Sequence, residues 1–216
     1  MIRTIIFDFG GVVIDIDYVR PIKKYKKYGI NDFETRFSKA TQDGFFQKME
    51  LGRVSNDAFI AEIRSISGKN LTHLEIISAW NSIIVGYQKK RIELLSKVKK
   101  NYSTILLSNT NALHIEEAMK LYNQDFQKPF SDLFHKIYWS YEIGMRKPDR
   151  KIFEFVLKQN HTFAYEALFI DDSIQHIEAA QTLGIKTLHL KDEMDMLDLF
   201  EENGKLKQLD TKNTNL

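Results

Sequence analysis

Residues 3–13 read R-T-I-I-F-D-F-G-G-V-V, an apolar run that ends in one acid and two glycines. Such a run is typical of a buried parallel strand, which would deliver Asp8 to the carboxyl edge of a sheet. In open α/β sheets, ligands bind in the crevice outside that edge. Gly10 and Gly11 let the backbone turn sharply and approach a bound group closely. An ordinary strand and turn, with Asp8 as a local cap, would have the same sequence. The choice between this interpretation and a ligand-binding edge therefore depends on the rest of the chain.

The composition is that of a soluble globular protein. The 216 residues are 43% hydrophobic and 28% charged, enough for one domain with a good core or for a core plus a small second domain. The formal net charge of +2 implies neither a nucleic-acid nor a membrane partner. The absence of cysteine excludes a disulfide framework, a thiolate metal site and a cysteine nucleophile. Because no stretch resembles a signal peptide or a membrane span, we expect a cytoplasmic protein.

Residues 15–86 contain no convincing strand, and their pattern predicts helices at 18–28, 32–49, 57–67 and 71–84. Ser55 is the expected N-cap of the third, and Thr72 and Glu75 are spaced as a capping box. Four helices are too many for one crossover, so we interpret 15–86 as an inserted helical cap. Its aromatic residues are expected to form its own core: Phe33, Phe37, Phe45, Phe46, Phe59 and Trp80.

Strands and helices alternate after residue 86. The pattern predicts strands at 103–108, 136–139, 167–171 and 186–190, and helices at 89–100, 112–122, 148–159, 173–183 and 192–202. This alternation implies a doubly wound parallel sheet of the Rossmann-like α/β class. The expected core is 1–14 plus 87–204, and the polar tail 205–216 is expected to be disordered.

Polar groups follow three of the predicted strands: Asp8, then the run Ser108-Asn109-Thr110, then Asp171 and Asp172. Lys147 stands just before a predicted helix start. In a parallel sheet these groups meet at one edge. Carboxylates suit Mg²⁺, an ammonium and helix N–H groups suit a phosphate, and a carboxylate between them can attack phosphorus.

Four stretches carry a resemblance to a known family: I-I-F-D-F-G-G-V-V, L-L-S-N-T, G-M-R-K-P-D and F-I-D-D-S. In this order they resemble the motifs of the haloacid dehalogenase superfamily of hydrolases, over the whole chain apart from the tail. Residues 46–59, F-Q-K-M-E-L-G-R-V-S-N-D-A-F, resemble a cap segment of one subgroup. That subgroup holds a bacterial sugar-1-phosphate phosphatase and the amino-terminal domain of soluble epoxide hydrolase.

The resemblance implies a Mg²⁺-dependent phosphatase that acts on a small phosphorylated metabolite, such as a sugar phosphate, through an aspartyl-phosphate. Asp8 would be the nucleophile, Ser108 would donate to the transferring phosphoryl group, and Lys147 would neutralise charge and orient Asp8. The implied phosphate-binding residues are Gly10, Gly11, Ser108, Asn109 and Lys147. The implied metal ligands are Asp8, the Gly10 carbonyl, Asp172 and Asp171. Which of Asp171 and Asp172 contacts the metal directly is left open.

Gly10 departs from the family pattern, in which most phosphatases carry a general acid two residues after the nucleophile. General acid–base help is worth about 100- to 10,000-fold. Asp15 or Asp17 could reach in, a water on the cation could supply the proton, or the enzyme could be slow or restricted to good leaving groups. An anomeric sugar phosphate, with its more acidic leaving group, would suit such a site.

Other candidates are weaker. His114 either touches substrate or, as the favoured interpretation, lies on a helix surface, and His176 is expected beside the acidic pair. Glu50 and Arg53 are expected at a cap position that either contacts substrate or is solvated. Two other functions remain: a phosphate-binding protein without turnover, and a metal-independent 2-haloacid dehalogenase. The acidic pair argues against the dehalogenase, because those enzymes lack it.

Overall fold

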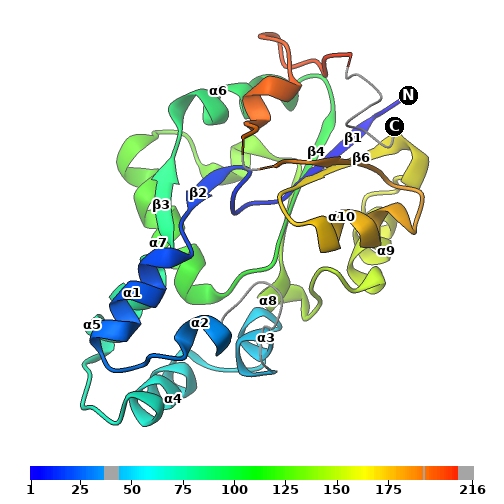
Figure 1. Ribbon diagram of the computed structural model, residues 1–216. Helices are drawn as coiled ribbons and strands as arrows, with labels where there is room; N and C mark the ends of the chain where they lie inside the picture. The colour runs from blue at the N-terminus through cyan, green and yellow to red at the C-terminus, as the bar shows by residue number, and fades with distance from the viewer. Residues whose placement is uncertain (37–43, 192, 209–216) are drawn as a thin grey trace.

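The central sheet has five parallel strands in the order β5-β4-β1-β6-β7 (Figure 1). The computed structural model describes residues 1–36, 44–191 and 193–208. The strands are β1 (Thr4–Phe7), β4 (Ser103–Ser108), β5 (Lys136–Trp139), β6 (Ala167–Asp171) and β7 (Lys186–His189). The predicted doubly wound α/β class is therefore confirmed, and β4, β5 and β6 have the predicted bounds.

Helices cover both faces of this sheet. On one face lie α6 (Lys89–Val98) and α7 (Ala112–Asp125), and on the other α9 (Arg150–Gln159) and α10 (Ile174–Gln181). Successive side chains of β1 alternate between the two cores, with Ile5 in the first and Ile6 in the second. Burial on both faces explains the unbroken apolar run.

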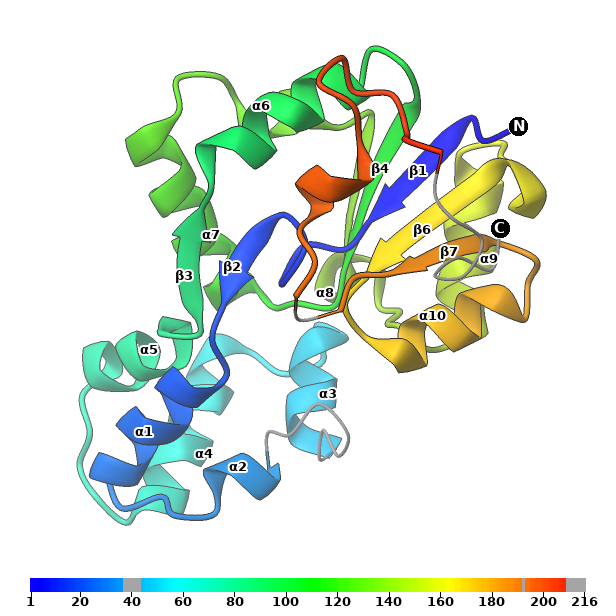
Figure 2. The same ribbon diagram turned by 45° about the horizontal axis from the view of Figure 1, so that its top comes forward.

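A second group of helices packs around its own core beyond the carboxyl edge of the sheet (Figure 2). They are α1 (Val19–Lys27), α2 (Phe33–Arg36), α3 (Gly44–Glu50), α4 (Asn56–Ser67) and α5 (His73–Asn81). Ser55 caps α4, and Thr72 and Glu75 form the expected capping box. The expected aromatic core is present for the described residues, whereas Phe37 lies outside them. The division of the chain into core and cap stays a prediction.

A two-stranded antiparallel ribbon, β2 (Ile14–Ile16) and β3 (Ile84–Tyr87), joins the two groups (Figure 2). This ribbon differs from the prediction, in which Ile84 belongs to the helix 71–84; that helix ends at Asn81. Strands this short carry little local signal, because each is stabilised by its partner rather than by its own periodicity.

The chain after β7 also differs from the prediction. No α-helix occupies the described part of 192–202, where the only helical turn is the 3₁₀ helix η3 (Met196–Leu199). Arg91 binds both carboxylate oxygens of Asp195, which fixes the start of that turn against α6. Leu206 forms a bridge with Phe200, so this part of the expected disordered tail is paired.

The segment between β4 and β6 carries three further short elements: η1 (Phe130–Leu133), α8 (Ser140–Ile143) and η2 (Ala164–Glu166). The helix expected at Pro148 begins at Arg150, because Asp149 is its N-cap and accepts a hydrogen bond from the Lys151 N–H. None of the helices in the described ranges combines the length and apolarity needed to cross a bilayer.

Candidate active site

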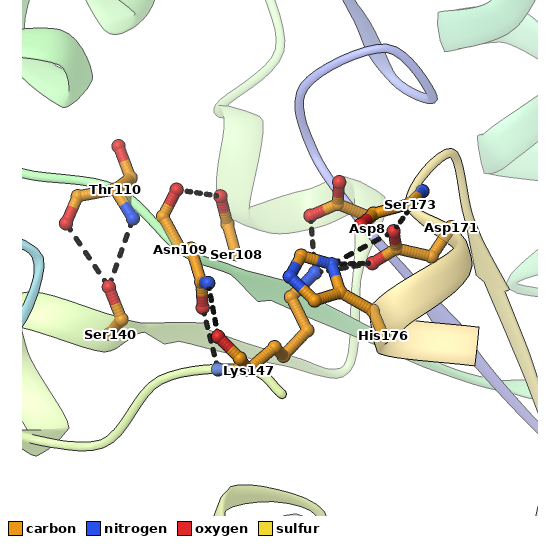
Figure 3. Close-up of polar contacts among 9 residues, drawn as sticks. All are labelled: Asp8, Ser108, Asn109, Thr110, Ser140, Lys147, Asp171, Ser173 and His176. Atoms are coloured by element: carbon orange, nitrogen blue, oxygen red, sulfur yellow. Dashed lines mark hydrogen bonds and ion pairs between the residues drawn. The ribbon is translucent and has the colours of Figure 1, made fainter. Parts of the chain in front are cut away.

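Lys147 links two carboxylates at the carboxyl edge of the sheet. Its Nζ donates to Asp8 Oδ1 at 2.7 Å and to Asp171 Oδ2 at 2.6 Å (Figure 3). Because β1 and β6 are neighbours, with Asp8 N donating to Ile170 O, the two acids leave the sheet side by side. We call Asp8, Lys147, Asp171 and Asp172 the charged floor. The sequence-predicted convergence of these groups is present.

The charged floor holds more negative than positive charge. Oxygens of all three of its acids lie within 4.8 Å of one another. Burial, together with Asp171 and Asp172, raises the pKa of Asp8 to about 7 despite the opposing effect of Lys147. A divalent cation among these oxygens would relieve this repulsion, and carboxylate and carbonyl oxygens are the ligands Mg²⁺ prefers. The donor set therefore fits the implied cation.

Asp171 is engaged on both of its oxygens. Besides Lys147, it accepts from the Ser173 N–H at 2.7 Å, and His176 Nδ1 lies 3.0 Å from both oxygens. Burial opposes ionisation, yet Lys147 and His176 outweigh it and lower the pKa of Asp171 to about 2. Burial and Lys147 lower the pKa of His176, so the ring is neutral at pH 7 and Nδ1–H donates to Asp171.

The two glycines after Asp8 are placed differently. Gly10 lines the pocket, whereas Gly11 lies against Asp172, whose Oδ2 would be 2.6 Å from a Cβ at this position. Gly11 also has a φ of +77°, which favours glycine. Glycine at position 11 therefore lets the turn pass close to the Asp172 carboxylate.

Asn109 has a structural use that the sequence analysis did not anticipate. Its side chain accepts from the Lys147 N–H at 2.8 Å and donates to the Lys147 carbonyl at 2.7 Å. This reciprocal pair fixes the backbone of Lys147 and uses one of the two N–H groups of the Asn109 amide. Ser108 is buried at the pocket beside Asp8, and Ser140 ties the following Thr110 to α8 through two hydrogen bonds.

A pocket opens above the charged floor. Its far side, which we call the distal wall, comes from residues 14–84 and consists of Ile14, Ile16, Tyr18, Phe46, Glu50, Trp80, Ile83 and Ile84. Ile16 approaches Gly10 so closely that a Cβ there would lie 3.0 Å from its Cδ1. An apolar side chain therefore stands where a residue-10 acid would project.

Neither Asp15 nor Asp17 lines the pocket, so the first of the three alternatives for supplying the proton finds no support. Asp15 accepts from Arg91 Nη1 at 2.6 Å and from Gln88 Nε2 at 3.0 Å. Asp17 accepts from the Val19 N–H at the start of α1. Tyr18 does line the pocket, but burial and nearby carboxylates raise the pKa of its phenol far above the ordinary value. The phenol therefore holds its proton tightly and is a poor general acid.

Of the two interpretations of His114, the favoured one, a place on the helix surface, is wrong, because its ring lines the pocket. Its ring is buried at the pocket and stacks on Trp80, with centroids 4.6 Å apart. Asn111 Oδ1 accepts from the His114 N–H and from Trp80 Nε1, which turns its amide nitrogen toward His114 Nδ1. Nδ1 is therefore the acceptor, and burial lowers the pKa of His114 to about 4.

Of the two cap candidates, Glu50 lines the pocket, whereas Arg53 is exposed and does not line it.

The haloacid dehalogenase-like hydrolase family matches residues 2–184. The chain belongs to this family. It is 35% identical to D-ribitol-5-phosphate phosphatase of Bacteroides thetaiotaomicron over 87% of this chain and 91% of that protein. It is 27% identical to a sesquiterpene phosphatase of Aspergillus oryzae over 89% and 91% of the two chains.

A solved structure from the same family superposes closely. A Bacteroides thetaiotaomicron enzyme of the family, in complex with magnesium and inorganic phosphate, gives a TM-score of 0.83 at 34% identity, covering 93% of this chain and all of that one. The predicted superfamily, the phosphoric monoester hydrolase class and the Mg²⁺ dependence are thereby confirmed. The roles of individual residues stay predictions.

Proposed function

We propose that this protein hydrolyses the phosphate ester of a small polyol or sugar, with Mg²⁺ as cofactor and Asp8 as nucleophile. The observation that carries the proposal is the buried Lys147 ammonium that holds Asp8 beside Asp171 and Asp172 under a pocket. The similarity to a D-ribitol-5-phosphate phosphatase supports the polyol or sugar as leaving group. That relative's name points to a 5-phosphate rather than to an anomeric phosphate.

In the first step Asp8 attacks phosphorus, the Asp8 Oδ–P bond forms, and the P–O bond to the leaving alcohol breaks. In the second step water attacks the aspartyl-phosphate, releasing phosphate and restoring Asp8. Lys147 keeps Asp8 oriented and offsets charge, and Ser108 is placed to donate to the phosphoryl oxygens. When bound, Mg²⁺ reduces the repulsion between anionic nucleophile and anionic ester.

The engagement of Asp171 favours Asp172 as the direct metal ligand. Lys147, Ser173 and His176 already occupy both Asp171 oxygens, so we assign Asp171 to positioning Lys147. Asp172 borders Gly11 and faces the pocket with Asp8. The Gly10 carbonyl is retained by any residue at that position, so glycine there does not weaken the metal site.

Phosphate release tests the proposal. Ribitol 5-phosphate, a panel of sugar phosphates and chloropropionate are incubated with the protein, with Mg²⁺ and with a chelator. We expect phosphate release from the polyol or sugar esters with Mg²⁺ only. Chelator-insensitive chloride release would favour the dehalogenase, and saturable phosphate binding without turnover would favour a non-catalytic protein.

A further inference from the structure

One hydrogen bond joins the distal wall to the helices that cover the central sheet. Trp80, in α5, donates from Nε1 to Asn111 Oδ1 at 3.3 Å, and Asn111 is the N-cap of α7. Only 2% of Trp80 and 4% of Asn111 is exposed, and both residues line the same pocket as Asp8. The bond therefore connects a helix of the second group with a helix of the sheet layer, at the pocket itself.

His114 and two phenylalanines surround the indole that makes this bond. Asn111 Oδ1 also accepts from the His114 N–H at 3.1 Å, and the His114 ring stacks on the Trp80 indole at an interplanar angle of 17°. The same indole packs against Phe59 and Phe46, at centroid distances of 4.9 and 5.4 Å. The place of the Trp80 indole therefore sets the place of the aromatic side chains that pack on it.

Asn111 belongs to a short run of residues that also builds the charged floor. Two residues before it, Asn109 accepts from the Lys147 N–H at 2.8 Å and donates to the Lys147 carbonyl at 2.7 Å. One residue earlier still, Ser108 ends β4 at the pocket. Because consecutive Cα atoms are about 3.8 Å apart, a few steps of backbone separate the contact to the wall from the contact to the floor. The place of Trp80 above the floor therefore depends on this run.

Helix capping alone does not require asparagine at position 111. Serine, threonine and aspartate cap helices about as well, and α4 and α5 are capped by Ser55 and Thr72. A serine hydroxyl, however, lies one bond nearer to the backbone than Oδ1 of asparagine. It could accept from the His114 N–H but would not occupy the place from which Oδ1 reaches Trp80 Nε1. The longer side chain is needed for the bond to the wall.

We propose that Asn111 is a positioning residue, which holds Trp80, and with it the distal wall, at a fixed place above the charged floor. The inference rests on the proposed function and states how the pocket distinguishes one leaving alcohol from another. An alcohol large enough to contact the wall would meet a surface that is already in place, so its binding would not have to order that surface. An ester with a small leaving group would depend less on the wall.

Substrates of two sizes and variants on both sides of the bond test this inference. Asn111→Ser and Trp80→Phe each remove the bond. We expect KM for ribitol 5-phosphate, relative to KM for acetyl phosphate with its two-carbon leaving group, to rise about 3- to 10-fold in each, the value of one neutral hydrogen bond. Asn111→Asp, which keeps an acceptor at the same place, should restore most of the ratio. Asn123→Ser, at an exposed position of α7, is the matched control.

The double variant shows whether the two residues act through the same bond. Asn111→Ser combined with Trp80→Phe should change the KM ratio no more than the stronger single variant, because either substitution alone already removes the bond. Additive effects of the two substitutions would overturn the inference. Equal changes of KM on both substrates would indicate a general structural role and would overturn it as well.

Hydrogen exchange separates this inference from the proposed function. The chain has two tryptophans, so ¹⁵N-labelled tryptophan gives two indole N–H signals, which Trp80→Phe assigns. On Asn111→Ser we expect exchange of the Trp80 indole N–H to become at least about fivefold faster, while that of Trp139 stays as in wild type. Unchanged exchange at Trp80 would overturn the inference even in an active enzyme. If wild type hydrolyses no ester but exchange at Trp80 responds, only the proposed function fails.

Discussion

The charged floor and the distal wall meet at one pocket but are built by different means. On the floor, Lys147 and its carboxylates are linked by short bonds at the ends of adjacent strands. The distal wall is mainly apolar and aromatic, with one ion pair to the core at Glu50. From this difference we expect the reaction to depend on the floor and the choice of substrate to depend on the wall. Variants on the two sides should therefore fail in different ways.

The largest effect is expected at the nucleophile. Asp8→Asn should lower kcat at least about 10⁴-fold, because an amide cannot form the acyl phosphate. The same variant removes one of three clustered carboxylates, so without Mg²⁺ its free energy of unfolding at pH 7 should equal or exceed that of wild type. Phosphate release and urea unfolding measure the two quantities, with Asp125→Asn at the exposed end of α7 as control. Wild-type turnover by Asp8→Asn would show that Asp8 is not the nucleophile.

The floor itself should be sensitive to the loss of its one ammonium. Lys147→Met leaves Asp8 and Asp171 buried without their partner, which should cost about 3–5 kcal/mol of stability as well as activity. Chemical denaturation at pH 7 measures the change, and Lys151→Met, at an exposed position of α9, should be near neutral. If the unfolding free energy falls by less than about 1 kcal/mol, Lys147 does not stabilise the Asp8 and Asp171 carboxylates as the short distances imply.

The sequence predicted the floor better than the wall, for a physical reason. Asp8, Asp171 and Asp172 follow buried strands whose apolar runs are legible, and parallel strands bring their ends together whatever the loops do. The wall depends on three-dimensional packing instead. No local pattern indicates that Ile16 covers Gly10, that Trp80 stacks on His114, or that β2 pairs with β3. The position of His176, one helical turn after Asp172, indicates a place near the site. No sequence pattern indicates a place at the site for Ser140 or Tyr18.

Acidification should affect the wall through His114. In the unfolded chain a histidine has a pKa near 6.5, whereas burial lowers the pKa of His114 to about 4. Between these values the unfolded state binds a proton at this ring that the native state does not, so the His114 contribution to stability is full above pH 6.5 and is lost as the pH drops toward 4. The loss should reach about 3 kcal/mol. Asp8 acts in the opposite direction over this range, because its native-state pKa is raised to about 7.

His114→Gln tests that assignment, because it removes the titration. The difference in unfolding free energy between this variant and wild type should rise in favour of the variant as the pH falls from 6.5 to 4. His73→Gln, at an exposed position of α5, should keep the wild-type slope. Parallel slopes for wild type and His114→Gln would show that the ring is not held neutral against Trp80.

The smallest effect is expected at the contact between Gly10, two residues after Asp8 of the floor, and Ile16 of the distal wall. Without an acid at residue 10, the rate of Asp8 phosphorylation should fall steeply as the pKa of the leaving alcohol rises, which single-turnover rates on aryl and alkyl phosphates measure. Gly10→Asp alone should gain little, because its Cβ would lie 3.0 Å from Ile16 Cδ1 and the new carboxylate would compete with Ile16 for space. Adding Ile16→Ala makes room, and the double variant should raise the rate on alkyl phosphates about 10-fold over Ile16→Ala alone, with little gain on aryl phosphates. An acid that is newly installed and not supported by neighbours should recover only part of the 100- to 10,000-fold range known for general acids.

The wild-type measurement can contradict this account. If the wild-type rate does not depend on the pKa of the leaving alcohol, the pocket holds a proton donor elsewhere, and the apolar character of Ile16 is then irrelevant to the chemistry.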